Sequence, residues 1–251
     1  MASDQRAVAR KTRWLPKHCF SDQGPEESKA MAIRPLLLGH RGARGEKSIP
    51  ENTLASFELA LAEGCDGFEF DVRLTSDGQP VVCHDATAHG LKIAESSAEK
   101  LRLPGLREVL ARYQNSAFLD IELKVSGLET IATDLLRRLA PARGFVVSSF
   151  LPEVLESVHG VDTSIPLGLI CETQAELSHW RQLPVGYVIP HHKLVRKSLI
   201  DEVAAAGKKI LVWTANATVD MKRFSKWGVD GIISDHPKRL ARALDRQLEK
   251  T

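Results

Sequence analysis

Short apolar runs alternate with amphipathic segments along most of the chain. The apolar runs are five to eight residues long and rich in Val, Ile, Leu and Phe, which is typical of buried β-strands. There are nine such runs, at residues 35–40, 67–74, 80–85, 117–124, 144–150, 166–171, 186–191, 208–215 and 231–235. Segments with helical periodicity lie between most of them, at residues 52–64, 106–113, 128–140, 151–159, 196–207 and 218–228. This alternation predicts βα units and fits an α/β fold of the TIM-type (β/α)8 barrel class.

The first helical segment carries clear start and stop signals. Leu54, Phe57 and Leu61 fall on one face of the helix, which predicts that this face is buried. Either Asn52 or Thr53 is suited to cap its N-terminus, and Gly64 stands just past its end.

One connection breaks the alternation. Only residues 75–79 separate the runs at 67–74 and 80–85, and five residues are too few for a crossover helix. We therefore predict a barrel that is irregular between its second and third strands. Nine runs also compete for eight barrel positions, and the sequence does not identify the peripheral one.

Length and charge restrict the class of protein. A chain of 251 residues can form one large domain or two small ones, and a fold of this size buries about 75% of its extended-chain surface without help from disulfides. Lys and Arg minus Asp and Glu is 34 − 32 = +2, a near-neutral balance that argues against a general nucleic-acid binder. The oligomeric state is left open.

The cysteines and the N-terminal segment bear on location. Cys19, Cys65, Cys83 and Cys171 are scattered without metal-ligand spacing, which favours thiols in a reducing compartment. No apolar run approaches the ~20 residues of a membrane span, and the N-terminus lacks the apolar core of a secretory signal. We therefore expect a cytoplasmic protein without stable membrane insertion. Residues 1–33 lack an apolar period and are predicted to be a poorly ordered extension of a barrel domain at 34–251.

Ionisable and aromatic residues collect where the apolar runs end. The carboxyl ends of the strands form the catalytic face of a βα barrel, so these side chains are expected to meet. The residues in question are His40, Arg41, Glu69, Asp71, His84, Asp85, Glu122, Lys124 and Trp213. Each has an ordinary interpretation when taken alone, but their repetition on successive runs predicts one shared active site.

The spacing of the carboxylates predicts a metal. Glu69 and Asp71 are two residues apart on one strand and therefore share a face. Inward carboxylates repel each other unless protons or a cation compensate. A hard divalent cation held by carboxylate oxygens is the natural solution.

A multipart motif accompanies these residues. The order GHRG, PENT, FEFDVRLTSDG, PVVCHD, IELK, VSSF, VWTAN and GVDGIISDHP, within residues 36–237, strongly resembles that of glycerophosphodiester phosphodiesterases. The resemblance implies a TIM-type barrel that cleaves glycerophosphodiesters to glycerol 3-phosphate and an alcohol in glycerophospholipid breakdown. It also implies one divalent cation, Mg²⁺ or Ca²⁺.

Residue roles follow from the resemblance alone. It implies catalytic histidines at His40 and His84, and metal ligands at Glu69, Asp71 and Glu122. It further implies phosphate contacts from Arg41 and Lys124, a substrate wall at Trp213, a residue near the metal at Glu51 and a structural role for Asp235.

The sequence departs from the family after the HD motif. Members usually carry a substantial capping insertion there, whereas only a short segment precedes the helix at 106–113 here. The cap is therefore expected to be reduced, which leaves the preferred alcohol open. The attacking group is also open, either the glycerol hydroxyl or water, and so is the choice of acid and base, with His40 favoured as base.

Two other functions compete with this interpretation. A related phosphoinositide- or sphingolipid-cleaving enzyme would use similar residues, although the near-neutral charge argues against it. A noncatalytic binding barrel would be expected to have lost part of the site, yet both histidines and all three carboxylates are present.

Overall fold

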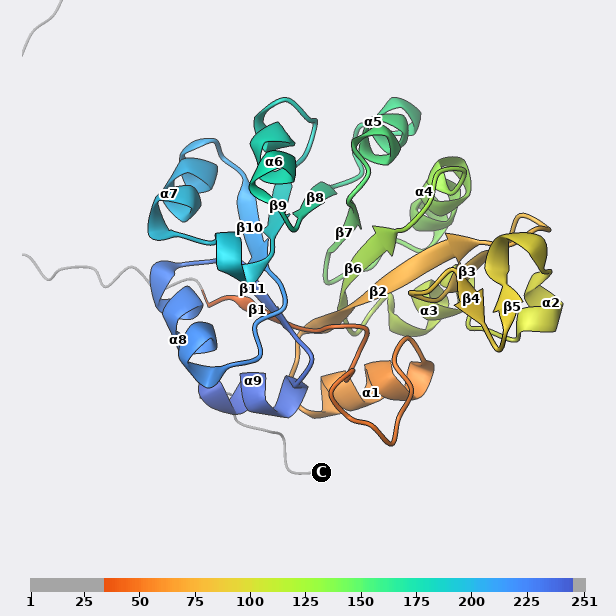
Figure 1. Cartoon of the computed structure of the whole chain (residues 1–251), viewed down its shortest axis with the longest axis horizontal. Coiled ribbons are helices and arrows are strands. Elements are labelled where there is room, and N and C mark those ends of the chain that lie inside the picture. Colours follow the sequence, from red (N-terminus) through yellow and green to blue (C-terminus); the bar gives the residue numbers. More distant parts are fainter. Residues whose placement is uncertain (1–33, 246–251) are drawn as a thin grey trace, which may run out of the picture. The chain divides into compact units, whose positions relative to one another are not determined.

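The computed structural model describes residues 34–245 and contains a closed barrel of eight parallel strands (Figure 1). Parallel pairing runs through β1, β11, β10, β9, β8, β7, β6 and β2, and the β1–β2 pair closes the ring. The strands are β1 (Leu36–Gly39), β2 (Gly67–Leu74), β6 (Phe118–Leu123), β7 (Phe145–Ser149), β8 (Leu167–Cys171), β9 (Tyr187–Pro190), β10 (Lys209–Val212) and β11 (Gly231–Ser234). The predicted TIM-type barrel is confirmed. The predicted extension at residues 1–33 lies outside the described residues.

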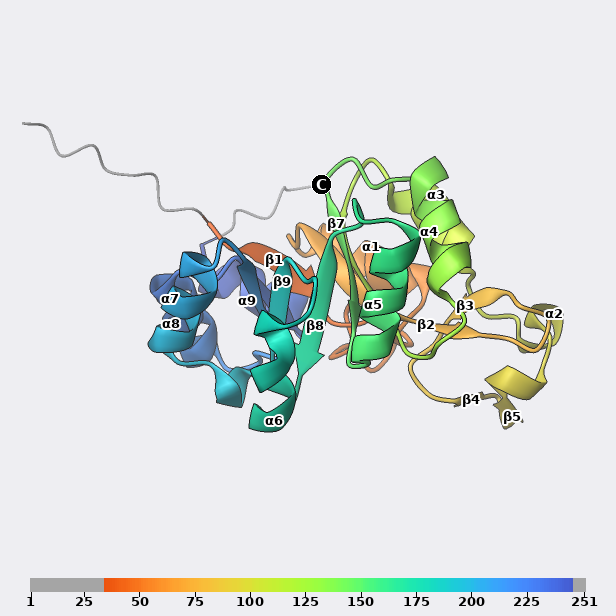
Figure 2. The ribbon, with the colours of Figure 1, turned by 90° about the horizontal axis from the view of Figure 1, so that it is seen from above.

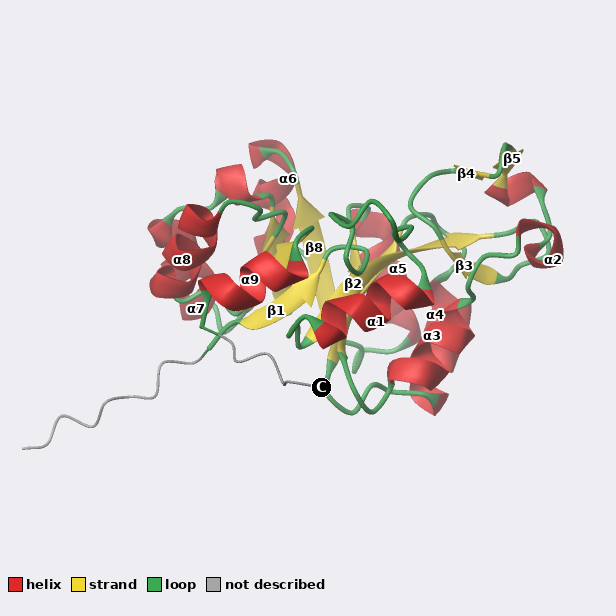
Figure 3. Ribbon diagram, turned by 90° about the horizontal axis from the view of Figure 1, so that it is seen from below, coloured by secondary structure: helices red, strands yellow, loops and turns green. Residues whose placement is uncertain are grey.

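Helices surround the barrel on its outer side (Figures 2 and 3). Each of the six predicted helical segments coincides with one of them, namely α1 (Leu54–Ala62), α3 (Leu106–Tyr113), α4 (Glu129–Arg138), α5 (Pro152–Val161), α7 (Lys197–Ala205) and α8 (Thr218–Trp227). Helix α5 extends two residues beyond the predicted segment at 151–159. The sequence did not predict α6 (Gln174–Leu177), the following turn η2 (Ser178–Arg181), the turn η3 (His192–Leu194) or α9 (Pro237–Ala243). These elements are too short for a clear helical period.

Helix α1 begins and ends as its sequence signals require. The Thr53 hydroxyl accepts a hydrogen bond from the backbone N–H of Ser56 at 3.2 Å, so Thr53 rather than Asn52 is the N-cap. Phe57 is fully buried and stacks on Phe68 of β2 with ring centroids 4.2 Å apart. This contact fixes the helix against the outer face of β2.

The predicted irregularity is a β-hairpin. β3 (Pro80–Val82) pairs antiparallel with the far end of β2, where Val72 lies opposite Val82. The run at 80–85 is therefore the peripheral one of the nine. After β3, a small lobe at residues 86–103 contains β4 (Thr87–Ala88), β5 (Leu91–Lys92), η1 (Ile93–Glu95) and α2 (Ala98–Leu101). This lobe is the predicted reduced cap, and its own core is formed by Ile93 and Leu101 with Val81.

Alternate residues of each barrel strand face inward, and the others pack against the helices. On β2, Phe68, Phe70 and Val72 join the outer core, as the two-residue period predicts. The barrel interior is a separate apolar cluster of Leu38, Phe118, Val146, Ile170, Tyr187, Ile189, Leu211 and Ile233. None of the helices between residues 34 and 245 is long and apolar enough to span a membrane.

Candidate active site

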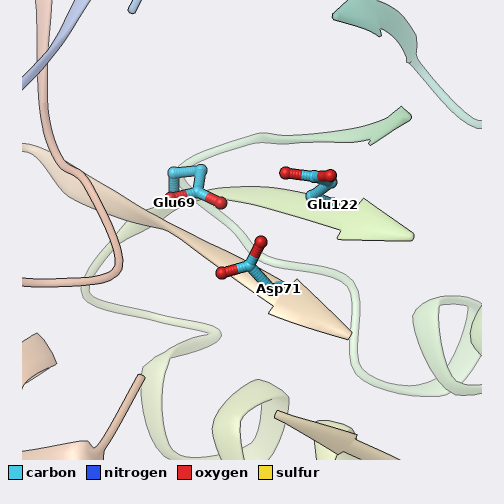
Figure 4. A group of neighbouring side chains, drawn as sticks. All are labelled: Glu69, Asp71 and Glu122. Carbon is cyan, nitrogen blue, oxygen red and sulfur yellow. The ribbon is translucent and has the colours of Figure 1, made fainter. Parts of the chain in front are cut away.

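Three buried carboxylates meet at the inward face of two adjacent strands (Figure 4). Glu69 and Asp71 come from β2, Glu122 comes from β6, and Asp71 lies directly opposite Glu122 in the register. One oxygen from each side chain lies within 4.8 Å of the others. Glu69 Oε1 is buried and has no hydrogen-bond partner within the described residues. A convergent set of hard oxygen donors with an unpaired atom fits a divalent cation.

The charges around the cluster are distributed unevenly. Burial, followed by the charge of Asp71, raises the pKa of Glu69 well above its ordinary value and that of Glu122 to about 7. Burial also acts to raise the pKa of Asp71, but Lys124 and Arg41 outweigh it, and this pKa is lowered. Without a cation, therefore, burial favours the protonated forms of Glu69 and Glu122, and metal binding would compete with those protons.

His40 follows β1 and is held by an acidic partner. Its Nδ1 lies 2.7 Å from Asp235 Oδ1, and its Nε2 lies 3.8 Å from Glu69 Oε2. Asn216 in turn donates a hydrogen bond from Nδ2 to Asp235 Oδ2 at 2.6 Å. The carboxylate favours a proton on Nδ1, which leaves Nε2 free to accept one on the side of the metal cluster. Burial lowers the pKa of His40, and the bond to Asp235 opposes that effect.

His84 reaches the site by way of the hairpin. β3 runs back along β2, and the loop after it places His84 at the edge of the cavity. Its Nδ1 lies 2.8 Å from Asp85 Oδ1, and Arg73 donates a hydrogen bond from Nε to the His84 carbonyl at 2.7 Å. The side chain of His84 is 33% exposed, against 11% for His40, so His84 is the more accessible of the two histidines.

Two cationic side chains flank the carboxylates. Lys124 Nζ lies 2.6 Å from Glu122 Oε1, and Arg41 Nε lies 3.3 Å from Asp71 Oδ2. Glu51, which the resemblance places near the metal, instead accepts hydrogen bonds from Arg41 at 2.7 Å and from Arg44 at 2.8 Å. Its structural contact is therefore with the guanidinium groups.

One side of a cavity of about 290 Å³ is polar, and it is lined by His40, Arg41, Glu69, His84, Asp120, Glu122 and Lys124. Asp71 is almost fully buried and does not line the cavity. The other side is mainly apolar and is formed by Phe150, Ile170, Ile189, Trp213 and Ile233, with Glu172 at the same cavity. The Trp213 ring meets Phe150 edge-on at 5.6 Å, and its Nε1–H donates to the Ile189 carbonyl at 2.9 Å. Trp213 thus lies in a cavity wall, the position that the resemblance implies.

Sequence reasoning missed several polar neighbours of the cluster. Asn52 donates a hydrogen bond from Nδ2 to Asp71 Oδ2 at 2.8 Å, whereas the sequence indicated it only as a candidate N-cap of the first helix. Asp120 is buried beside Glu122 and accepts a 2.6 Å hydrogen bond from Ser148; burial raises its pKa to about 7. Its two-residue spacing from Glu122 was the available signal for this position.

The same period identifies other cavity residues. The residue two positions after the last inward-facing residue of a strand also faces inward, and it lies at the catalytic face of the barrel. Applied to β6, β7, β8 and β10, this rule gives Lys124, Phe150, Glu172 and Trp213, all of which line the cavity. Applied to β9 and β11, it gives His191, whose ring contacts Trp213, and Asp235, which contacts His40. Phe150, Glu172 and His191 were not among the predicted site residues, and Asp235 was assigned only a structural role.

Comparison with known proteins agrees with the motif. The family described as Glycerophosphoryl diester phosphodiesterase matches residues 40–118 and 119–239. A glycerophosphodiester phosphodiesterase of Caldanaerobacter subterraneus subsp. tengcongensis is 30% identical over 238 residues, covering 83% of this chain and 97% of that protein. The structure of an Oleispira antarctica phosphodiesterase in complex with the product sn-glycerol-3-phosphate has a TM-score of 0.74 and 27% identity, covering 84% of this chain and 97% of that one. A glycerophosphodiester phosphodiesterase from Parabacteroides distasonis shares the fold with a TM-score of 0.75 and 23% identity, covering 85% and 98% of the two chains.

Proposed function

The chain belongs to the glycerophosphoryl diester phosphodiesterase family and is an enzyme that hydrolyses glycerophosphodiesters, and we propose that it does so with one divalent cation and two acid–base histidines. The proposed products are sn-glycerol 3-phosphate and an alcohol, as in the breakdown of deacylated glycerophospholipids. The observation that carries the proposal is the convergence of Glu69, Asp71 and Glu122, two of which line one cavity with both histidines.

Glu69, Asp71 and Glu122 would hold the cation, which is Mg²⁺ or Ca²⁺ by the chemistry of the all-oxygen donor set. When bound, it supplies a positive charge that polarises the phosphoryl group and offsets the charge that develops on its oxygens. Arg41 and Lys124 lie beside the cluster and stabilise the same oxygens by charge-assisted hydrogen bonds.

His40 is proposed as the base of the first step. Its Nδ1 is engaged by Asp235, so Nε2 is the nitrogen available to accept the proton of the attacking hydroxyl. Asp235 stabilises the resulting imidazolium and keeps the ring oriented. The orientation of His40 is therefore fixed before the substrate arrives.

His84 is proposed as the acid that protonates the leaving oxygen. The partial exposure of its side chain gives the departing alcohol a route to solvent. Because the lobe at 86–103 is short, the alcohol meets few contacts. We therefore propose similar kcat/KM values for choline, ethanolamine and glycerol leaving groups, within about tenfold.

Two nucleophiles fit this arrangement of acid and base. Attack by the neighbouring glycerol hydroxyl would give a cyclic phosphate that water then opens, whereas direct attack by water would not. Phosphorus NMR during turnover distinguishes the two routes, since only the first passes through a cyclic glycerophosphate.

Product analysis tests the proposed function. Glycerophosphocholine and glycerophosphoethanolamine are incubated with the protein and either Mg²⁺, Ca²⁺ or a chelator. We expect sn-glycerol 3-phosphate and the free alcohol with a cation present, and loss of turnover after thorough chelation. Full turnover by chelated protein would contradict the metal role, and no turnover with any diester under any condition would contradict the function.

A further inference from the structure

Glu172 occupies a distinctive place in the cavity. It follows β8, two residues after Ile170, and therefore continues the inward-facing set of that strand. Among the cavity-lining residues that come from β7 to β11 or directly follow them, Glu172 is the one ionisable side chain within residues 34–245. The others are Phe150, Ile170, Ile189, Trp213 and Ile233.

The carboxylate of Glu172 is available to a ligand. The structure contains no hydrogen bond or ion pair to it from any residue between 34 and 245, although its side chain borders the cavity. Its backbone is fixed, because the N–H groups of Glu172 and Thr173 both donate to Glu176 Oε2, at 2.7 and 2.9 Å. Glu172 is thus an exposed acceptor on an anchored piece of chain at the side of the site away from the metal cluster.

The two sides of the site suit the two halves of a diester. Every glycerophosphodiester has the same three-carbon half, whereas the alcohol half varies in size. The side near His84 is polar and partly open, and the side formed by the ends of β7 to β11 is walled by large apolar residues and by the exposed Glu172. The constant glycerol half therefore fits the walled side, with its carbons against Trp213 and Phe150. Its hydroxyls need a polar partner there, and Glu172 is the ionisable side chain among the mainly apolar residues of this wall.

We propose that Glu172 is a specificity-determining residue that accepts a hydrogen bond from the terminal hydroxyl of the glycerol half. The inner hydroxyl lies next to the phosphate and so remains near His40. The terminal hydroxyl is one carbon further on and extends toward Glu172. This role rests on the proposed function. It selects a free terminal hydroxyl over an acylated or phosphorylated one, since an ester cannot donate a hydrogen bond and a phosphate is repelled by the carboxylate.

A substrate pair that differs by one hydroxyl tests this role. Glycerophosphocholine is compared with 2-hydroxypropyl phosphocholine, which lacks only the terminal hydroxyl, and kcat/KM is measured for each. We expect the unchanged protein to favour glycerophosphocholine by roughly ten- to a hundredfold, the range for a hydrogen bond to a charged group. In Glu172→Ala this ratio should fall to within about threefold of one. Glu172→Gln keeps an acceptor oxygen and should retain part of the preference.

Controls distinguish the role of Glu172 in substrate selection from the proposed hydrolytic activity itself. Glu156→Ala removes an exposed carboxylate of α5 that does not line the cavity, and should keep the ratio of the unchanged protein. An active Glu172→Ala variant with an unaltered ratio would overturn the inference and leave the proposed function intact. The inference would also be overturned if Glu172→Ala instead changed the relative kcat/KM for choline and glycerol leaving groups, since Glu172 would then face the alcohol half. Failure of the unchanged protein to hydrolyse either diester would overturn the proposed function, and the inference with it.

Discussion

The interior of the barrel has two unlike sides. Along β1 and β7 to β11 its inward positions are mainly apolar, with side chains such as Leu38, Val146 and Leu211, all fully buried. Along β2 and β6, apart from Phe118 at the start of β6, the inward positions carry four acidic residues, Glu69, Asp71, Asp120 and Glu122. The same strand geometry therefore supports a packed hydrophobic core on one side and a set of mutually repelling carboxylates on the other.

This difference shows which side of the barrel interior stabilises the fold and which side destabilises it. Burying a large apolar side chain contributes about 1.5–3 kcal/mol. A buried carboxylate costs free energy unless it is paired or neutralised. Here Lys124 and Arg41 compensate only part of the acidic charge. Burial, followed by the charge of Asp71, raises the pKa of Glu122 to about 7. The acidic side is therefore kept for chemistry, while the apolar side and the outer core hold the barrel together.

The largest effect is expected at the histidines beside the acidic side. His40→Ala and His84→Ala should each lower kcat by ~10²–10⁴-fold, the usual contribution of an acid–base group. Both variants should fold, because neither side chain belongs to an apolar cluster of the described residues. Steady-state kinetics and circular dichroism check the two statements, and a fully active His84→Ala protein would remove that residue from the mechanism.

A truncation on the apolar side should act on stability instead. Leu211→Ala removes a fully buried side chain of β10 and should lower the free energy of unfolding by about 2–5 kcal/mol. At a temperature where the variant is folded, its turnover should remain within a few-fold of the parent value. Denaturant unfolding and kinetics measure both, and a large loss of kcat in folded protein would mean that the two sides are not separable.

Glu69→Gln should behave in the opposite way to Leu211→Ala, with a loss of cation binding and little change in stability. The amide keeps the shape of the side chain and can still accept the 2.9 Å hydrogen bond from the Arg41 backbone N–H, but it loses the charge. Cation affinity should fall by at least about a hundredfold. The melting temperature in chelator should stay within a few degrees of the parent value, because burial already favours the neutral form of Glu69 when no cation is bound. Calorimetry and thermal unfolding test the pair. Unchanged cation affinity would place the metal elsewhere.

The smallest effect is one of pH on the acidic side. The pKa of Glu122 is raised from its ordinary 4.5 to about 7 by burial and then by Asp71, so cation binding must displace its proton below pH 7. The Kd for Mg²⁺ or Ca²⁺ should weaken by about tenfold per unit as the pH falls from 7 to 5, and should level off above pH 8.

The free energy of unfolding of the cation-free protein should depend on pH in the opposite direction to cation affinity. A carboxyl group with a raised pKa contributes stability below pH 4.5, and this contribution is lost as the pH rises through 7. Calorimetric titrations with Mg²⁺ or Ca²⁺ between pH 5 and pH 8 measure the cation affinity. A Kd that is independent of pH would show that Glu122 is not a ligand.

Much of the apolar side could be predicted from the sequence, because each strand shows itself by a local run of apolar residues. The two-residue period of Glu69 and Asp71 also predicted their shared face correctly. Pairing partners are a different matter, since they depend on the tertiary fold. The contact of Asp235 with His40 joins residues 195 positions apart, and no local pattern encodes it.

The hairpin was the hardest element to assign. Its run at 80–85 has the composition of a barrel strand, and only the five-residue connection distinguished it. Direction in a sheet depends on the length of the connection rather than on the residues of the strand itself. The sequence therefore located the irregularity at residues 75–79 but left open which strand was peripheral.

The clamped ends of the lobe have a consequence for the evolution of this enzyme. The N–H of Val82 donates to the Pro104 carbonyl at 2.8 Å, and Val81 pairs with Gly105, so the chain enters and leaves the lobe at nearly the same point. Lengthening a loop with fixed ends costs little, about 0.6 kcal/mol for each doubling. Residues 86–103 are therefore expected to tolerate lengthening or replacement while His84 and the carboxylates keep their positions. Under the proposed function, a longer segment here would be a route to a new preference for the departing alcohol.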